Sequence, residues 1–410
     1  MKSITVVDAR MGRGKSSAAI RYMNQCKGSK PFLYITPYLT EVDRVCELCD
    51  FEEPGCDYMS KSTQLKKLMQ RRCNVASTHV LFGIMDEEAL EIAKDQGYSL
   101  IIDESLDVIQ GVKVPPDDKN ILMEKLMSVD KDTGLVTWMD EDYKGAFSGY
   151  KELADAGMLY CYAGTMYEVM NPQRFMAFDE VYMLTYLFAG QLQRAYLDYF
   201  GFTYNIVGVE KDEEGYRFSD RPDEPPPIDY SELINIAGLE DAEYERMNGV
   251  GDARTALSAN WFVQRGRTHP EVRRLRANMH SFFTRGTSNA AGRRLWTTFK
   301  ENKNWMLGDR NRYASSFLPL NARATNAYRT ANCVAYLVNR FVNPNIVKFF
   351  SAKGIEIDPE AFALSEMLQF IWRSAIREEQ PISLYIPSGR MRELLIGWMR
   401  ETSNGGYQGG

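Results

Sequence analysis

The chain has no long apolar run and no dense set of cysteines. No segment approaches the ~18 consecutive apolar residues that a membrane-spanning helix needs, so we expect no contact with a membrane. Seven cysteines in 410 residues are an odd number and lack the pattern of a disulfide framework, which indicates a reducing, cytoplasmic setting. We expect no signal peptide, because the first predicted strand already begins at Ile4.

The composition is that of a folded globular protein. Hydrophobic residues make up 44% of the chain and charged residues 25%. A chain of 410 residues is long enough for two domains with full hydrophobic cores and a third, small module. We find no internal repeats.

Charge is distributed unevenly along the chain. The net charge of −6 alone argues weakly against a nucleic-acid partner. The segment from Arg265 to Arg312, however, contains twelve Lys/Arg and only three Asp/Glu. We interpret the aromatic residues among them, such as Phe282, Trp296 and Trp305, as core rather than as base-stacking platforms. The cations either bind phosphates or form a solvated face. Residues 210–232 are acidic and rich in proline, which indicates a linker.

A candidate phosphate-binding loop lies near the N-terminus. The β-branched run Ile4–Val7 leads into a turn with two glycines, and a helix is predicted from residue 16. Glycine lets backbone amides fold around a phosphate, a lysine after it reaches the β- and γ-phosphates, and the next hydroxyl binds Mg²⁺. The alternative is a chance glycine loop. The expected nucleotide-binding residues are Gly12, Arg13, Gly14, Lys15, Ser16 and Ser17.

Strands and helices alternate after this loop. The spacing is typical of parallel βαβ units. Strands are predicted at 31–37, 98–102, 158–165 and 181–188, and residues 73–82 as a strand that runs into a turn or short helix. Helices are predicted at 40–48, 87–96 and 191–200.

An acidic pair follows the most apolar of these strands. Asp103 and Glu104 come directly after Leu100–Ile102, at the carboxyl end of a strand, where open α/β sheets bind their ligands. We expect Asp103 to hold Mg²⁺ together with Ser16, and Glu104 to orient and deprotonate the attacking water. The alternative is an acidic helix cap after a strand.

A second alternating pattern occupies the C-terminal part. Strands are predicted at 295–299, 317–320, 334–338 and 382–386, with a helix at 359–377. We therefore expect an α/β fold of two lobes with parallel sheets, joined by a basic and helical segment. The predicted boundaries are 1–209 for the first lobe, 210–290 for the linker and basic segment, and 291–410 for the second lobe.

The order of these motifs resembles that of a superfamily 2 helicase, of the compact DEAD/DEAH-like type carried by bacteriophages. The loop at 9–16 is similar to motif I, 34–37 to motif Ia, and 103–106 to motif II. The resemblance implies that Thr36, Pro37 and Thr78 contact a nucleic-acid strand. It also implies that both lobes are RecA-like and that Ala163-Gly164-Thr165 is motif III, which couples hydrolysis to domain movement.

In the second half, residues 323–326 resemble motif V, with Thr325 toward nucleic acid, and residues 369–377 resemble motif VI. Motif VI implies that Gln369 faces the nucleotide and that Arg373 or Arg377 is the arginine finger. Trp372 replaces the usual glycine and the last arginine falls one residue late, so the choice of arginine stays open. Gln369, Arg373 and Arg377 are spaced i, i+4 and i+8, so on one continuous helix all three would face the same side.

The function that these motifs predict is an ATP- and Mg²⁺-dependent helicase or translocase. The resemblance implies single-stranded or branched DNA as the partner, in phage replication or recombination and alongside phage replication proteins. Two alternatives are a DNA-binding or remodelling module that does not unwind, and a terminase-type packaging ATPase. The latter would need a nuclease carboxylate cluster, and we see none after residue 320. Within the basic segment, we expect Arg273, Arg274 and Arg276 to bind the strand.

Four cysteines allow a different hypothesis. Cys46, Cys49, Cys56 and Cys73 could be a zinc site. The first pair falls in a predicted helix, where both thiols could not easily turn to one metal, so we favour ordinary thiols.

Overall fold

The computed structural model divides into two compact units. It describes residues 3–55, 59–224, 227–239, 243, 246–285, 291–307, 311–320 and 327–404. The first unit comprises Met1–Asp8, Lys15–Arg221 and Val342–Ile357, and the second comprises Ala9–Gly14, Pro222–Phe341 and Asp358–Gly410. In the described part of the chain, no helix is long and apolar enough to cross a bilayer.

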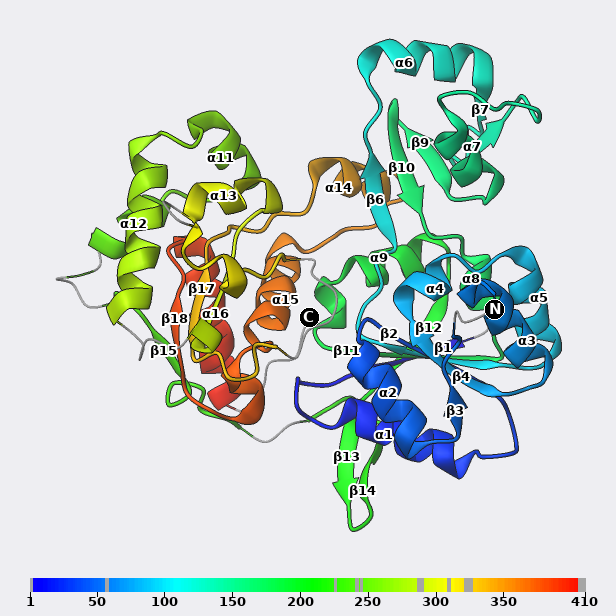
Figure 1. Ribbon diagram of the computed structural model, residues 1–410, viewed down its shortest axis with the longest axis horizontal. Coiled ribbons are helices and arrows are strands. Elements are labelled where there is room, and N and C mark those ends of the chain that lie inside the picture. The colour runs from blue at the N-terminus through cyan, green and yellow to red at the C-terminus, as the bar shows by residue number, and fades with distance from the viewer. Residues whose placement is uncertain are drawn as a thin grey trace. The chain divides into compact units, whose positions relative to one another are not determined.

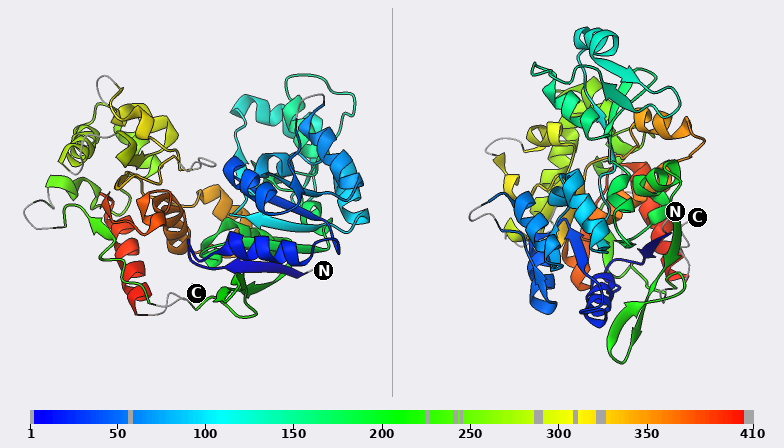
Figure 2. Two further views of the ribbon diagram at one scale, coloured as in Figure 1. Left: turned by 60° about the horizontal axis from the view of Figure 1, so that its bottom comes forward. Right: turned by 90° about the vertical axis from the view of Figure 1, so that its right-hand side faces the viewer.

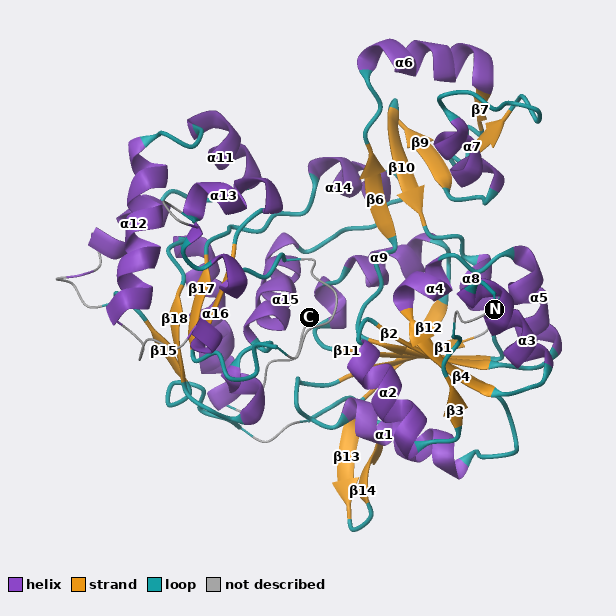
Figure 3. Cartoon of the chain, in the orientation of Figure 1, coloured by secondary structure: helices purple, strands orange, loops and turns teal. Residues whose placement is uncertain are grey.

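A seven-stranded parallel sheet forms the centre of the first unit (Figures 1 and 3). β2 and β5 are buried along their whole length, because helices cover both faces of such a sheet and its strands are apolar throughout. The strand order is β12-β1-β11-β5-β2-β4-β3, and every neighbouring pair is parallel. The strands are β1 (Ser3–Asp8), β2 (Phe32–Thr36), β3 (Phe51–Glu52), β4 (Asn74–Thr78), β5 (Ser99–Asp103), β11 (Glu180–Thr185) and β12 (Thr203–Val207).

The helices of this unit lie between those strands, as the alternation of the sequence predicts. They are α1 (Lys15–Gln25), α2 (Leu39–Leu48), α3 (Lys61–Gln70), α4 (His79–Gly83), α5 (Glu87–Asp95), α8 (Gln173–Met176) and α9 (Leu192–Tyr199). The predicted parallel βαβ arrangement is confirmed.

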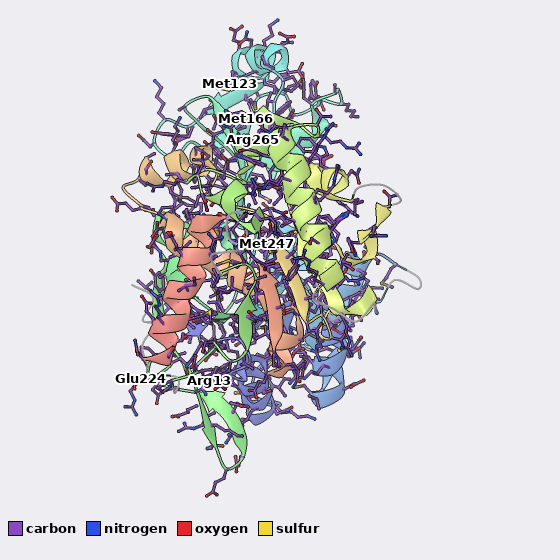
Figure 4. All side chains as sticks on the ribbon, turned by 90° about the vertical axis from the view of Figure 1, so that its left-hand side faces the viewer. Arg13, Met123, Met166, Glu224, Met247 and Arg265 are labelled. Atoms are coloured by element: carbon purple, nitrogen blue, oxygen red, sulfur yellow. The ribbon has the colours of Figure 1, made fainter. Side chains whose placement is uncertain are left out.

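A separate module is inserted between β5 and β11, and the sequence did not reveal it. It has its own core, which includes Leu122, Val136, Leu159 and Met166; Figure 4 labels Met123 and Met166 in it. Three antiparallel strands, β6 (Ile109–Val112), β10 (Thr165–Val169) and β9 (Leu159–Tyr162), form its sheet. The remaining elements are α6 (Pro116–Ile121), a π-helix (Leu122–Leu126), β7 (Met127–Val129), β8 (Val136–Trp138) and α7 (Ser148–Asp155).

The first unit also contains two late elements. The hairpin of β13 (Val209–Asp212) and β14 (Gly215–Phe218) packs along α1 (Figure 2). Residues predicted as the start of a linker therefore form ordered structure. From the second half of the chain, α14 (Pro344–Ser351) returns to the inserted module, where the Tyr167 hydroxyl donates to the Asn345 carbonyl at 2.9 Å.

The second unit is built on a four-stranded parallel sheet of order β15-β18-β17-β16. Its strands are β15 (Ile234–Ile236), β16 (Arg294–Thr297), β17 (Cys333–Tyr336) and β18 (Ile382–Tyr385). Its helices are α11 (Ala259–Arg265), α12 (Pro270–Arg285), α13 (Lys303–Met306), α15 (Pro359–Ile371) and α16 (Gly389–Ser403). The expected α/β fold with two parallel sheets is confirmed.

Three details differ from the sequence-based prediction. The division between units falls at 221/222, and residues 222–290 belong to the second unit rather than to a separate linker. Residues 317–320 form no strand; Phe317 makes only an isolated bridge to Trp296. The helix predicted to end at 377 ends at Ile371.

Candidate nucleotide-binding site

The phosphate-binding loop has the backbone that its glycines permit. Gly12 and Gly14 both have a φ of +81°. Glycine adopts this conformation at little energetic cost because it has no Cβ. Lys15 and Ser16 then open α1, so the loop runs into a helix N-terminus, where backbone N–H groups have no partner within the helix. The predicted strand, loop and helix are confirmed as structure.

Ser16 and Asp103 are brought into direct contact. The Ser16 Oγ donates a hydrogen bond to Asp103 Oδ2 at 2.9 Å, and the buried Tyr34 hydroxyl donates to the same oxygen at 2.6 Å. Burial raises the pKa of Tyr34 well above its ordinary value, which keeps the phenol protonated as a donor. Residues 87 positions apart thus meet because β1 and β5 end at the same edge of one sheet.

These oxygens fit Mg²⁺. The ion prefers hard oxygen ligands and is usually held by one or two carboxylates, with water and substrate phosphates completing its shell. A hydroxyl and a buried carboxylate in contact supply that kind of donor set. Within the described ranges, no group of three or more His, Cys, Asp or Glu could form an all-protein cage.

Glu104 is held in an unusual backbone conformation. Its φ is +67°, which is uncommon outside glycine and persists only where surrounding structure enforces it. The amide of Glu104 donates to the Leu184 carbonyl at 3.0 Å, and Tyr38 Oη lies 3.0 and 3.1 Å from its two carboxylate oxygens. Glu104 therefore has a fixed main chain and an oriented side chain.

The segment expected to contact nucleic acid instead supports the carboxylates. Thr36 is completely buried and its Oγ1 accepts the Tyr38 amide at 3.3 Å, so its side chain cannot reach a strand as predicted. Tyr34 and Tyr38, which flank it, bind Asp103 and Glu104. Neither tyrosine was predicted from the sequence as a site residue. The available signal was their position two residues before and two residues after Thr36, the last residue of β2.

Pro37 and Thr78 are partly exposed, so a contact with a strand is sterically open to them. Next to Thr78, the buried His79 has its Nε2 3.1 Å from the Asp103 carbonyl. That bond ties the end of β4 to the end of β5.

The prediction for motif III is wrong. Ala163 and Gly164 form the turn between β9 and β10 in the inserted module, and Thr165 begins β10, away from the central sheet. The strand between β1 and β5 is β11, which ends at Thr185. Its hydroxyl donates to Gln191 Oε1 at 2.9 Å. Thr185, with its partner Gln191, therefore lies at the end of the strand between β1 and β5, which only strand order reveals.

The side chain of Arg13 lies beside an acidic residue of the same unit. Its Nη2 lies 3.7 Å from Asp223 Oδ1, and the Asp223 side chain is only 5% exposed. Arg13 Nε and Asp223 Oδ2 are both buried without a hydrogen-bond partner. Figure 4 labels Arg13 together with the neighbouring Glu224. Burial raises the pKa of Tyr230. The positive charges of Arg13 and of Arg10, a second residue of the loop, oppose this rise.

The motif VI residues do not share one helical face. Gln369 lies on α15, but α15 ends at Ile371, and Arg377 lies in a 3-10 helix, Ala375–Glu378. Trp372 ends α15, with its ring against Tyr230 and Trp398, both at 5.4 Å between centroids. The half-buried Arg373 has an Nη1 without a hydrogen-bond partner, whereas Arg377 is exposed.

The motif V segment, with Thr325, lies outside the described residues.

Within the described residues, most cations of the basic segment are exposed, as expected, but several contact groups of the second unit. Arg265 pairs with Glu271, and Arg294 is buried with its guanidinium 5.2 Å from the Tyr313 ring centre. On α12, Arg274 and Arg276 donate to the carbonyls of Arg246 and Trp305, at 3.3 and 3.4 Å. Figure 4 labels Arg265 in this segment.

Arg273 is exposed, as is Arg274 despite its contact with the main chain. The interpretation of the aromatic residues as core is confirmed, since Phe282 and Trp296 are buried and Trp305 packs against the same core.

The thiols named as a zinc alternative lie where the predicted helix puts them. Cys46 is in α2 and Cys49 caps its C-terminus, close to the Ile20 carbonyl at 3.9 Å. Burial raises the pKa of Cys46 to about 11, which disfavours the thiolate that zinc needs. Cys56 lies outside the described residues.

Fold and site together define a two-unit α/β protein that has a phosphate-binding loop and an Asp-Glu pair at the end of a nearby parallel strand. Two family models match the chain: the YonV C-terminal Rossmann-like domain over residues 229–399, and the YonV middle domain over residues 109–168. The first range lies in the second unit, except for the stretch with α14, which belongs to the first unit. The second range coincides with the inserted module.

The SPbeta prophage-derived uncharacterized protein YonV of Bacillus subtilis (strain 168) is 34% identical over 97% of this chain and 99% of its own length. The chain therefore belongs to the YonV family.

Two solved structures are similar over nearly the whole chain. One, described as an XPD helicase, has a TM-score of 0.43 and 10% identity, over 98% of this chain and 95% of that one. The other, Xpd4 of S. tokodaii, has a TM-score of 0.47 and 11% identity, over 97% of this chain and 94% of that one.

Proposed function

We propose that this protein is an ATP-dependent nucleic-acid helicase or translocase. The observation that carries the proposal is the 2.9 Å bond from Ser16 Oγ to Asp103 Oδ2, which joins the phosphate-binding loop to the acidic strand end. In P-loop NTPases, a loop hydroxyl and a strand-end aspartate hold Mg²⁺ beside the β- and γ-phosphates. The same two residues stand together here.

The residues of the candidate nucleotide site have distinct tasks in this proposal. Lys15 binds the β- and γ-phosphates, with the amides of Gly12, Arg13, Gly14 and Ser17 around them. Ser16 and Asp103 hold Mg²⁺, which, when bound, neutralises phosphate charge. Glu104 orients the attacking water and accepts its proton, and Tyr38 fixes the Glu104 carboxylate in the required direction.

The proposal also includes an arginine that acts beside Lys15. An arginine that reaches the γ-phosphate stabilises the charge that develops there, an effect of roughly 10³–10⁵ in rate. We assign this task first to Arg373, because a buried guanidinium nitrogen without a partner favours an anionic ligand. Arg377 is the second candidate, and Gln369 is the proposed nucleotide contact on α15.

Nucleic acid is the proposed partner. The proposed contacts are Arg273, Arg274 and Arg276 on α12, together with Pro37, Thr78 and Thr325. The buried Thr36 is not among them. Because the relative from Bacillus subtilis is prophage-derived, we propose a role on single-stranded or branched DNA in phage replication or recombination, beside other phage replication proteins.

ATP hydrolysis and strand displacement by the full chain test the proposal. We expect ATPase activity that single-stranded DNA stimulates, and displacement of a strand from a tailed duplex of one polarity. The Glu104→Gln variant should bind ATP but hydrolyse it slowly, because the amide keeps the shape of the carboxylate and loses the base.

Stimulated hydrolysis without displacement on either tail would favour a remodelling module that does not unwind. Absence of ATP binding would contradict the proposal.

A further inference from the structure

An open cavity lies beside the helix that follows the phosphate-binding loop. It has a volume of about 410 Å³ and is formed between α1 and the β13–β14 hairpin, both in the first unit. Its walls are contributed by Ala18, Arg21, Tyr22 and Gln25 of α1 and by Asp212, Arg217 and Phe218 of the hairpin.

The cavity is close to the loop along the chain. A helix rises about 1.5 Å per residue, so Ala18 and Tyr22 lie about 5 and about 10 Å along the axis from Lys15. A nucleotide whose phosphates are held at Lys15 carries its ribose and base over such distances.

The polar groups of the cavity are held in a fixed arrangement. Arg21 donates to Asp212 at 2.7 Å and to Glu214 at 2.6 Å, and Arg217 pairs with Glu210 at 2.5 Å and with Asp212 at 3.4 Å. Carboxylates that bind a guanidinium at its edge leave its flat faces available for stacking. Two fixed guanidinium groups on one cavity are suited to a planar, electron-rich ring.

The aromatic groups are equally constrained. The Tyr22 hydroxyl donates to Glu180 at 2.9 Å and accepts from Lys30 at 2.7 Å, which fixes the orientation of its ring. Phe218 stacks on Tyr182 with 5.4 Å between ring centres, and its ring lies 5.6 Å from that of Tyr22. Both rings are ordered before any ligand enters, so stacking on them costs little conformational entropy.

We propose that this cavity binds the adenine base of the nucleotide whose phosphates are held by the loop. The proposal rests on the proposed function. Tyr22, Phe218 and the Arg217 guanidinium provide stacking surfaces, and the Gln25 amide is the edge contact. An amide both donates and accepts, which matches the adjacent donor and acceptor of adenine.

Binding of ATP and of inorganic tripolyphosphate, each with Mg²⁺, tests this assignment in the full chain. Tripolyphosphate carries the phosphates without the base. Stacking of a base on an aromatic ring is worth enough that Phe218→Ala should weaken ATP binding about tenfold. Arg217→Ala should weaken it severalfold, and tripolyphosphate affinity should not change in either variant. Gln25→Ala should reduce the preference for ATP over GTP.

Lys211→Ala is the matched control. Lys211 is adjacent to Asp212 on β13, lies near the Tyr216 ring at 5.6 Å and does not line the cavity. Its ATP affinity should equal that of the unmodified protein.

A ratio of ATP to tripolyphosphate affinity that is unchanged in Phe218→Ala and Arg217→Ala would overturn the base site. So would a parallel loss of both affinities, which would mean a general disturbance of the unit. If the unmodified protein bound neither ATP nor tripolyphosphate, the proposed function itself would be wrong, so the two failures are distinguishable.

Crosslinking gives an independent measurement. With 8-azido-ATP, whose reactive group is on the base, the labelled peptides should contain Tyr22 or residues 215–218. Labelling confined to other peptides would overturn the assignment.

Discussion

The carboxylates of the first unit and the arginines of the second differ in how they are positioned. Asp103 and Glu104 follow a fully buried strand, and tyrosines from the next strand hold both side chains. Arg373 follows the end of a helix, and one of its guanidinium nitrogens is buried without a partner. The first arrangement is complete without a ligand.

This difference bears on how such a protein could couple hydrolysis to movement. A rigid acidic site keeps the water and the metal ligands in place through every cycle. In the proposed function, a cation that gains its partner only when ATP is bound would make ATP a ligand that favours one conformation of the protein over another. The predictions below test the two halves of this contrast, from the largest expected effect to the smallest.

Loss of Lys15 should have the largest effect. We expect Lys15→Ala to abolish measurable ATP hydrolysis, because the substitution removes a phosphate contact, while binding of single-stranded DNA stays largely intact. Steady-state phosphate release measures the effect. Lys27→Ala, which removes an exposed lysine paired with Asp50 at 3.3 Å, is the control. Normal turnover in Lys15→Ala would remove the nucleotide site from the first unit.

The arginines should differ from each other. We expect Arg373→Ala to reduce the ATPase rate by roughly 10³, with little loss of ATP affinity, and Arg377→Ala to have a much smaller effect. Arg373→Lys, which keeps the charge but not the fork of donors, should recover part of the rate. The measurement is kcat beside the Kd for ATP. If both alanine variants hydrolysed ATP normally, the proposed role of the second unit in the site would fail.

Tyr38 tests the rigidity of the acidic half. Tyr38→Phe removes only the hydroxyl that contacts both oxygens of Glu104, so we expect kcat to fall about tenfold with KM unchanged. In the Glu104→Gln background, Tyr38→Phe should have almost no further effect on kcat, because the carboxylate that Tyr38 orients is no longer there. Additive losses in the double variant would mean that Tyr38 acts elsewhere.

The basic segment should show the smallest effect on hydrolysis itself. We expect Arg273→Ala/Arg274→Ala/Arg276→Ala to weaken DNA binding without dependence on sequence and to flatten the plot of log affinity against log salt. Each lost phosphate contact changes that slope by roughly 0.7 for single strands. Basal ATPase activity should stay nearly unchanged, while its stimulation by DNA falls.

The control for the basic segment removes three exposed cations of the first unit, Lys67, Arg71 and Lys94, by substitution with alanine. Because Arg274 and Arg276 also bond to main-chain carbonyls, Tm should be measured in both triple variants. An unaltered salt slope together with unaltered stimulation would place the arginines on a solvated face.

Local features of the site were accessible from the sequence. The phosphate-binding loop needs glycines in a left-handed conformation between a strand and a helix, and the spacing of Gly12, Gly14 and Lys15 encodes that directly. The run 98–102 followed by Asp103 marks a strand buried on both faces with a carboxylate at its end. Such features depend on neighbouring residues, so the pattern alone determined them.

Other features depended on residues far apart in the chain, and only the tertiary structure decided them. β11 lies between β1 and β5, so Thr185 rather than Thr165 is at the central edge, and strand order is not written in any one segment. The residues after 371 favour a helix locally, yet the chain leaves it because Trp372 packs on Tyr230 and Trp398, and the Ala375 amide bonds to the Ala331 carbonyl at 2.9 Å. Tertiary packing overrides helix propensity there, since burying large aromatic rings outweighs the small differences in propensity per residue.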